Sequence, residues 1–131
     1  MIRSRNRVVF LFLVLTTIFI ASYFALAHVS LAVFYAICLL MGIAAGYWAV
    51  FVTIASEQFG TNIRATVTTT APNFVRGSVV IMTSAFQALQ PAVGIRGSAM
   101  IVGAAAVAVA FISLAGLEES YGKDLDYLEL P

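Results

Sequence analysis

The sequence predicts an all-α membrane protein with four transmembrane helices. Hydrophobic residues make up 62% of the 131-residue chain and charged residues 10%, whereas a soluble domain is about 45–50% apolar and about 25% charged. Four apolar stretches each reach the roughly 20 residues that a helix needs to cross a bilayer. Inside a bilayer these stretches must be helical, because a helix satisfies its own backbone hydrogen bonds.

The spans follow one another with short connections and form one domain. In chain order we expect them at about 8–27, 31–55, 65–89 and 98–117, followed by a polar tail at 118–131. The chain breaks at 28–30, 60–62 and 91–97, where glycine, proline and short polar residues interrupt the apolar pattern. Ser30 is a candidate N-cap for the second helix.

Basic residues outside the spans predict the orientation of the protein in the membrane. One of them, Arg96, lies on one side, and five lie on the side of the N-terminus: Arg3, Arg5, Arg7, Arg64 and Lys123. We therefore expect a multi-pass protein of the plasma membrane, the inner membrane of a bacterial cell, with both termini in the cytoplasm.

Composition also excludes several function classes. The net charge of +1 is too small to suggest a nucleic-acid partner. A single cysteine, Cys38, excludes an intramolecular disulfide and a multi-cysteine metal site. The sequence has no nucleophile–base constellation and no acidic pair within the spans. We expect neither an enzyme nor a bound metal or cofactor.

The third span differs from the others because polar residues recur along it at spacings of three and four. They are Thr66, Thr69, Thr70, Asn73, Arg76, Gly77, Ser84 and Gln87. This spacing places them on one stripe of a helix, which would face a water-filled cavity or polar partner helices. The alternative is that the threonines bond only to their own backbone. The first and fourth spans are apolar all round and are expected at the periphery.

Arg76 is the most informative residue of that stripe. It lies 12 residues after Arg64, or about 18 Å along a helix, and an arginine at mid-membrane costs at least about 2.5–3.5 kcal/mol. It is interpreted as a clamp for an anion or carboxylate or as half of a transport-coupled ion pair. The alternatives are a structural pair with a helix outside this chain, or snorkelling to the interface. Pro72 should kink the helix beside it.

Five further residues complete the predicted cavity lining around Arg76. Asn73, Thr69 and Gln87 share its stripe, and Tyr47 and Trp48 lie near the middle of the second span as either packing residues or cavity walls. Together these side chains are the substrate-binding candidates, and Arg76 favours an anionic or carboxylate-bearing solute.

Residues 55–66 resemble the cytoplasmic loop between helices 10 and 11 of major facilitator superfamily transporters, in particular sugar porters and metabolite–proton symporters. The family pattern P-x-E-x-F-P-T-x-x-R-A is kept at Glu57, Phe59, Thr61, Arg64 and Ala65. The two prolines are replaced by Ala55 and Gly60. Residues 119–125 are similar to the E-T-x-G-K-x-L signature after helix 12, and residues 3–7 to the end of the basic loop between helices 8 and 9.

The resemblance implies that the four spans are helices 9 to 12 of a twelve-helix major facilitator fold. This chain would then be the C-terminal third of a secondary transporter, either truncated or partial. The whole protein would move a small solute by alternating access, in symport with a proton. Its partners would be the bilayer, the solute, the proton and the remaining helices. A sugar is disfavoured, because Val52 stands where sugar porters carry a tryptophan.

Carried over by position, Glu57 and Arg64 resemble the charged residues of the cytoplasmic gate, and Arg5 and Arg7 are the natural partners of Glu57. The alternative is that Glu57 and Arg64 only anchor helix ends at the headgroups. Two other functions stay open for the chain as a whole. One is a self-contained four-helix oligomeric transporter, which the lack of an acid in the first span disfavours. The other is a non-transporting accessory subunit of a membrane complex.

Overall fold

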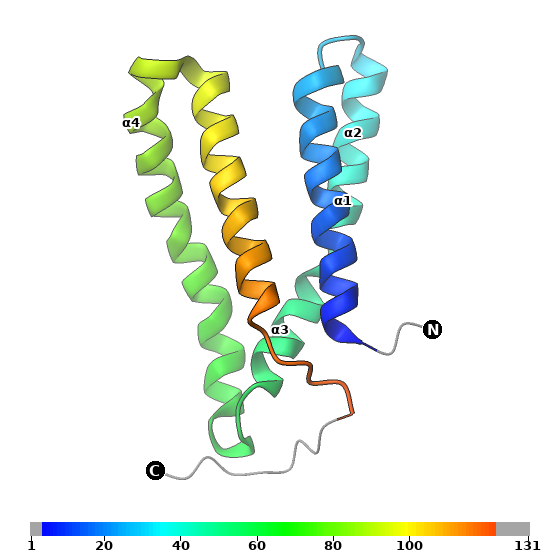
Figure 1. Cartoon of the computed structure of the whole chain (residues 1–131), viewed down its shortest axis with the longest axis vertical. Helices are drawn as coiled ribbons and strands as arrows, with labels where there is room; N and C mark the ends of the chain where they lie inside the picture. Colours follow the sequence, from blue (N-terminus) through cyan, green and yellow to red (C-terminus); the bar gives the residue numbers. More distant parts are fainter. Residues whose placement is uncertain (1–3, 123–131) are drawn as a thin grey trace.

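A computed structural model describes residues 4–122, and all regular secondary structure in that range is helical. Its elements, in chain order, are α1 (Arg5–Leu26), α2 (Leu31–Ala44), the 3-10 helix η1 (Ala45–Tyr47), α3 (Trp48–Glu57) and α4 (Thr61–Ala115) (Figure 1). Ser30 caps α2 as predicted, since its hydroxyl oxygen accepts a hydrogen bond from the Val33 N–H at 3.2 Å. Arg3 and the tail residues Lys123, Asp124 and Leu125 lie outside the described residues.

Three helical stretches within 4–122 are long and apolar enough to cross a membrane. They are α1, the run 31–57 formed by α2, η1 and α3, and α4. We expected four spans, but the third and the fourth are joined in the single helix α4, with no loop between them. The structure therefore has three continuous helical stretches of this length.

The second predicted span is not one straight helix. It is interrupted at Ala45–Tyr47 by η1, and α3 departs from the direction of α2 beyond this point (Figure 1). The interruption contains Gly46, and glycine lowers helix stability by about 1 kcal/mol relative to alanine. The bend turns α3 toward α4, which it contacts.

The expected break at 91–97 is reduced to a single residue. Gly94 alone within α4 leaves the helical region, with φ 72° and ψ 175°. Figure 1 shows α4 rising to this point and then folding back, so we name residues 61–93 the first arm and 95–115 the second arm. Pro72 and Pro91 lie inside the helix. The residues around Pro72 keep helical dihedral angles, so the predicted kink there does not take the form of a break in the helix.

Small side chains around Gly94 hold the two arms at this turn. The Ser98 side chain is fully buried, and its hydroxyl donates to the Gly94 carbonyl at 2.7 Å. Val93 folds over Gly97, where an added Cβ would lie 3.0 Å from the Val93 Cβ. The turn therefore depends on glycine at 94 for its backbone and on glycine at 97 for space.

Helix α1 occupies a central position, in contrast to the peripheral place expected for the first span. It contacts α2, η1, α3 and α4. Phe10 meets Phe111 of the second arm edge to face, with ring centroids 5.9 Å apart, and Tyr23 packs on Phe34 of α2 at 6.1 Å. The apolar surface of α1 is thus compatible with contacts to several helices as well as with contact to lipid.

The helices bury little of their apolar surface against one another. The buried hydrophobic side chains of the described residues are Leu13, Ile37, Ala44 and Ile54. Large apolar side chains on the first arm remain uncovered, with Phe74 76% and Ile81 73% exposed. Apolar surface exposed on this scale marks a lipid or protein interface. The fold therefore suits a bilayer or contact with further helices.

Candidate functional site

An ion pair joins α1 to α3 at the end of the bundle where the chain begins. Arg5, in the first turn of α1, pairs with the carboxylate of Glu57, the last residue of α3. The Glu57 side chain is 9% exposed and that of Arg5 29%. Ser120, buried just after α4, donates its hydroxyl hydrogen to Glu57 Oε2 at 2.8 Å. The carboxylate is thus held by a cation from α1 and a hydroxyl from the tail.

A second carboxylate, Glu119, caps the N-terminus of α1. It accepts the backbone N–H of Arg5 at 3.0 Å and that of Asn6 at 3.3 Å, and it also accepts the hydroxyl of Ser4. These N–H groups have no partner inside the helix. The hydrogen bond from Ser4, followed by the backbone hydrogen bonds, lowers the pKa of Glu119 from 4.5 to about 2 despite partial desolvation.

Residues 117–120, which we name the base strap, connect the ends of three helices. Besides Glu119 and Ser120, the strap offers the Leu117 carbonyl to the Asn6 side-chain amide at 2.8 Å. The Glu118 carbonyl accepts from the Gln58 side-chain amide at 2.8 Å. Every residue of the strap is therefore bonded to α1 or to the end of α3, and the strap fixes the position of the Arg5–Glu57 pair.

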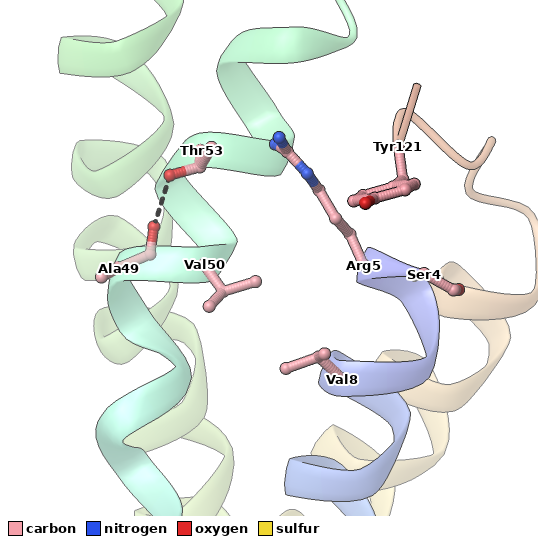
Figure 2. Close-up of a pocket in the computed structure, with 7 residues that line it drawn as sticks. All are labelled: Ser4, Arg5, Val8, Ala49, Val50, Thr53 and Tyr121. Atoms are coloured by element: carbon pink, nitrogen blue, oxygen red, sulfur yellow. Dashed lines mark hydrogen bonds between the residues drawn. The ribbon is translucent and has the colours of Figure 1, made fainter. Parts of the chain in front are cut away.

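A cavity of about 340 Å³ lies beside this pair, between α1 and α3. Figure 2 shows Arg5 reaching from the start of α1 toward the end of α3, with the Tyr121 ring beside it and Val8 and Val50 on the facing helices. The remaining lining residues are Ser4, Ala49 and Thr53, and the Thr53 hydroxyl donates to the Ala49 carbonyl at 2.9 Å. The cavity lining combines polar and apolar side chains, and none of the predicted substrate-binding residues belongs to it.

The other two predicted gate residues have different surroundings. Arg64 bridges the connection between α3 and α4, donating to the carbonyls of Ser56 at 3.2 Å and Phe59 at 3.1 Å. Arg7 is exposed on α1 and forms no ion pair with any residue from 4 to 122. The structure thus brings Glu57 together with Arg5 and gives Arg64 a role in closing a turn.

The polar stripe lies on the exposed side of the first arm and forms a chain of local hydrogen bonds. The Arg76 guanidinium donates to Asn73 Oδ1 at 3.3 Å, and the Asn73 amide donates to the Thr69 carbonyl at 3.0 Å. The Thr69 hydroxyl donates to the Thr66 carbonyl at 2.9 Å, as the backbone-bonding alternative expects. Gln87 is exposed on the same arm. The described residues therefore place no wall opposite the stripe.

Tyr47 and Trp48 are separated from that stripe. Tyr47 packs on Phe12 of α1 with ring centroids 6.4 Å apart. Trp48 is 42% exposed and leans on Phe51 at 5.4 Å. Of the two interpretations offered for these aromatic residues, packing describes Tyr47, while Trp48 remains open to contact outside the chain.

Sequence reasoning assigned no role to Ser4, Asn6, Glu119 or Ser120. Ser4 precedes the helix by one residue and is the N-cap, with its hydroxyl oxygen accepting the Arg7 N–H at 3.2 Å, so a capping search would have found it. Glu119 and Ser120 bond to residues more than 60 positions away, and no local pattern encodes such contacts. No group of three or more histidine, cysteine, aspartate or glutamate side chains suited to a metal ion occurs within 4–122.

Comparisons of the chain with models of protein families, with curated proteins and with solved structures found no match.

Proposed function

We propose that this chain is part of a secondary transporter of the major facilitator type, contributing its helices 9 to 12. In this proposal α1 is helix 9, the run from α2 to α3 is helix 10, and the two arms of α4 are helices 11 and 12. The complete protein moves a small anionic solute by alternating access coupled to a proton. The two arms support this count, because 55 residues of helix would extend about 80 Å and the bilayer core is about 30 Å thick.

The observation that carries the proposal is the Arg5–Glu57 pair with the base strap around it. The pair joins two helices at the end of the bundle where the resemblance implies the cytoplasmic gate. It is mostly withdrawn from water, so that its formation and rupture change the energy of closure substantially. Rocking of one helical bundle against another about a central site is the motion of such transporters. The pair is then a lock for one of the two states.

The solute site in this proposal lies at the exposed stripe of the first arm. Arg76, oriented by Asn73, supplies a cation in the apolar region, and a guanidinium binds a carboxylate with two parallel hydrogen bonds. The missing wall opposite this stripe belongs to the remaining helices of the protein. This chain alone should therefore not transport, and uptake into liposomes that contain only this chain would contradict the proposal.

The first experiment is to read the DNA upstream of the Met1 codon. An open frame that encodes about eight more apolar spans supports the assignment to a twelve-helix protein. An in-frame stop preceded by no such spans overturns it and favours an oligomeric transporter or an accessory subunit.

The gate is tested in cells that express the complete frame, with proton-driven uptake of radiolabelled lactate, benzoate and succinate as probes and glucose as the uncharged comparison. Arg5→Gln and Glu57→Gln should each change the uptake rate about ten-fold or more, because a charged hydrogen bond contributes roughly 1.5–3 kcal/mol. The double variant Arg5→Glu with Glu57→Arg is the matched control. It keeps both charges and should recover much of the rate. Equal rates in all four proteins would exclude the lock.

A non-transporting membrane subunit is the second candidate, and the exposed side of the first arm favours it. Arg76 is exposed there, and Phe74 and Ile81 are exposed on another face of the same arm, a combination that also suits partner helices, one of them bearing a carboxylate. Arg76→Ala distinguishes the two functions. Loss of solute uptake supports the transporter, whereas loss of co-purifying protein with unchanged uptake supports the subunit.

A further inference from the structure

A second cavity, of about 430 Å³, lies at the same end of the molecule but on the other side of α1. It is formed by the first turns of α1 and the last turns of the second arm of α4. Its lining residues are Asn6, Arg7, Phe10, Phe111, Leu114 and Ala115. Its volume falls in the range of about 300–1,000 Å³ that small-molecule sites occupy, and nothing in the proposed transport mechanism uses it.

The walls of this cavity are built from two rows of side chains. Arg7 and Phe10 are three residues apart on α1, and Phe111 and Leu114 are three apart on α4, so each pair lies on one helix face. The two rows meet where Phe10 and Phe111 touch edge to face. The cavity therefore has an almost wholly apolar wall along both helices, and the exposed Arg7 is the one charged residue of its lining.

The charge of Arg7 is available to bind an anionic ligand, whereas the charge of Arg5 is already paired with Glu57. Residues two apart on a helix point about 200° from each other, which explains why Arg5 turns toward α3 and Glu57 (Figure 2) while Arg7 lines the opposite cavity. Arg7 is exposed and has no ion-pair partner among the described residues. Its guanidinium is suited to bind a phosphate with two hydrogen bonds.

We infer that this cavity binds one anionic phospholipid. The phosphodiester of the headgroup lies against Arg7, and the start of an acyl chain follows Phe10, Phe111 and Leu114. Arg7 directly precedes the apolar residues that begin the first span, which places it at headgroup depth. The cytoplasmic leaflet, toward which basic residues orient, is the one that carries anionic lipids. The inference needs a membrane location but no transport activity.

Native mass spectrometry of the full chain in a mild non-ionic detergent tests this inference. The probes are phosphatidylglycerol, phosphatidylcholine with the same acyl chains, and sn-glycerol 3-phosphate as the soluble phosphate. Phosphatidylglycerol should bind the unaltered chain about five-fold more tightly than phosphatidylcholine, the effect expected for one arginine at an anionic surface. Arg7→Gln should abolish this preference, and Arg7→Lys should keep most of it.

A second pair of variants tests the apolar wall. Leu114→Trp fills the cavity and should lower the binding of both lipids. Ile112→Trp adds the same side chain at a position that is 72% exposed and outside the cavity lining, so it should leave binding unchanged. Circular dichroism confirms that each variant keeps its helix content, and Arg7→Gln alone decides the question if Leu114→Trp does not fold.

Two results would overturn the inference. One is an unchanged preference for phosphatidylglycerol in Arg7→Gln. The other is binding of sn-glycerol 3-phosphate as tight as that of phosphatidylglycerol, which would assign the cavity to a soluble anion. Because the measurement uses no transported solute, its failure leaves the transporter proposal unaffected, and the loss of that proposal leaves the lipid site unaffected.

Discussion

Each end of α1 is bound by a side chain of the charge that the helix dipole favours there. Glu119 accepts the N–H groups of Arg5 and Asn6 at the N-terminus, and Arg96 donates to the Phe24 carbonyl at 2.6 Å in the last turn. A helix dipole stabilises an anion at its N-terminus and a cation at its C-terminus. Arg96 lies at the start of the second arm of α4 and Glu119 lies after its end, so contacts at both ends fix α1 against this arm.

Replacing Glu119 by glutamine should loosen the first turn of α1. The amide keeps its acceptor oxygen but loses the charge, which contributes about 0.3–1 kcal/mol at a helix N-terminus. Because the fold lowers the pKa of Glu119 from 4.5 to about 2, this stabilisation is complete above pH 4.5 and is lost as the pH falls toward 2. Amide hydrogen exchange of residues 4–12 in detergent measures the effect.

Two comparisons make that measurement decisive. Above pH 5, Glu119→Gln should exchange faster than the unaltered chain, and the difference should shrink as the pH approaches 2. A difference that stays constant down to pH 2, after correction for intrinsic exchange rates, would show that the carboxylate charge does not stabilise α1.

At the scale of elements, the turn of α4 shows how one residue redirects 55 residues of helix. The dihedral angles of Gly94 lie in a region that is essentially restricted to glycine. The Ser98 hydroxyl, one turn further on, donates to the Gly94 carbonyl. Proline at 91 and glycine at 94 and 97 made a break predictable, while the helical conformation of the residues on either side of Gly94 was not.

Gly94→Ala should destabilise the protein by about 1–3 kcal/mol, the cost of holding a residue with a side chain in this conformation. The added Cβ would meet nothing within 4 Å, so the cost is one of backbone strain alone. Unfolding by sodium dodecyl sulfate, followed by circular dichroism, measures the difference in free energy.

Gly103→Ala in the second arm is the matched control. It also has open space around an added Cβ and has no positive φ. There the substitution should be neutral or stabilise the helix by up to about 1 kcal/mol. An equal effect of the two substitutions would show that the turn does not depend on the conformation of Gly94.

The whole molecule is an open arrangement whose helices contact one another over narrow strips. Four hydrophobic side chains are buried in the described part of the chain, and the hydrogen bonds that join distant residues cluster at the base strap and at Arg96. Packing between α1, α2 and the second arm does not close a core. The exposed apolar surface requires an apolar environment, which the bilayer and additional helices would provide together.

Single cysteines test the membrane arrangement in a Cys38→Ala background. His28→Cys lies in the α1–α2 turn, Ala92→Cys beside the α4 turn and Tyr121→Cys in the chain after α4; all three positions are exposed. A membrane-impermeant maleimide applied to intact cells should label the first two and spare the third, which becomes reactive on lysis. The expected orientation follows from the basic residues.

Each alternative arrangement gives its own labelling pattern. Reaction of Tyr121→Cys alone in intact cells would mean the inverted orientation. Reaction of His28→Cys with protection of Ala92→Cys would mean that the two arms of α4 do not cross the membrane separately.

The helical fold, the apolar stretches long enough to cross a membrane and the position of the turns were predictable from the sequence alone. These properties depend on composition and on residues close together in the chain: apolar runs of span length, Ser30 as a cap and glycine at the turns. Arg5 and Glu57 were also singled out, but through a family resemblance, and their pairing rests on contacts across 52 positions that only the folded chain makes.

Tertiary structure decided the central position of α1, the bend at η1 and the base strap. All three features depend on which faces of the helices pack against one another. Because nearly every helix face in this chain is apolar, the hydrophobic pattern of the sequence does not show which faces those are. The same reason separates the two arginines of the first turn. Their spacing shows that they point apart, but only the arrangement of α3 and α4 gives Arg5 a carboxylate and leaves Arg7 in the lining of an apolar cavity.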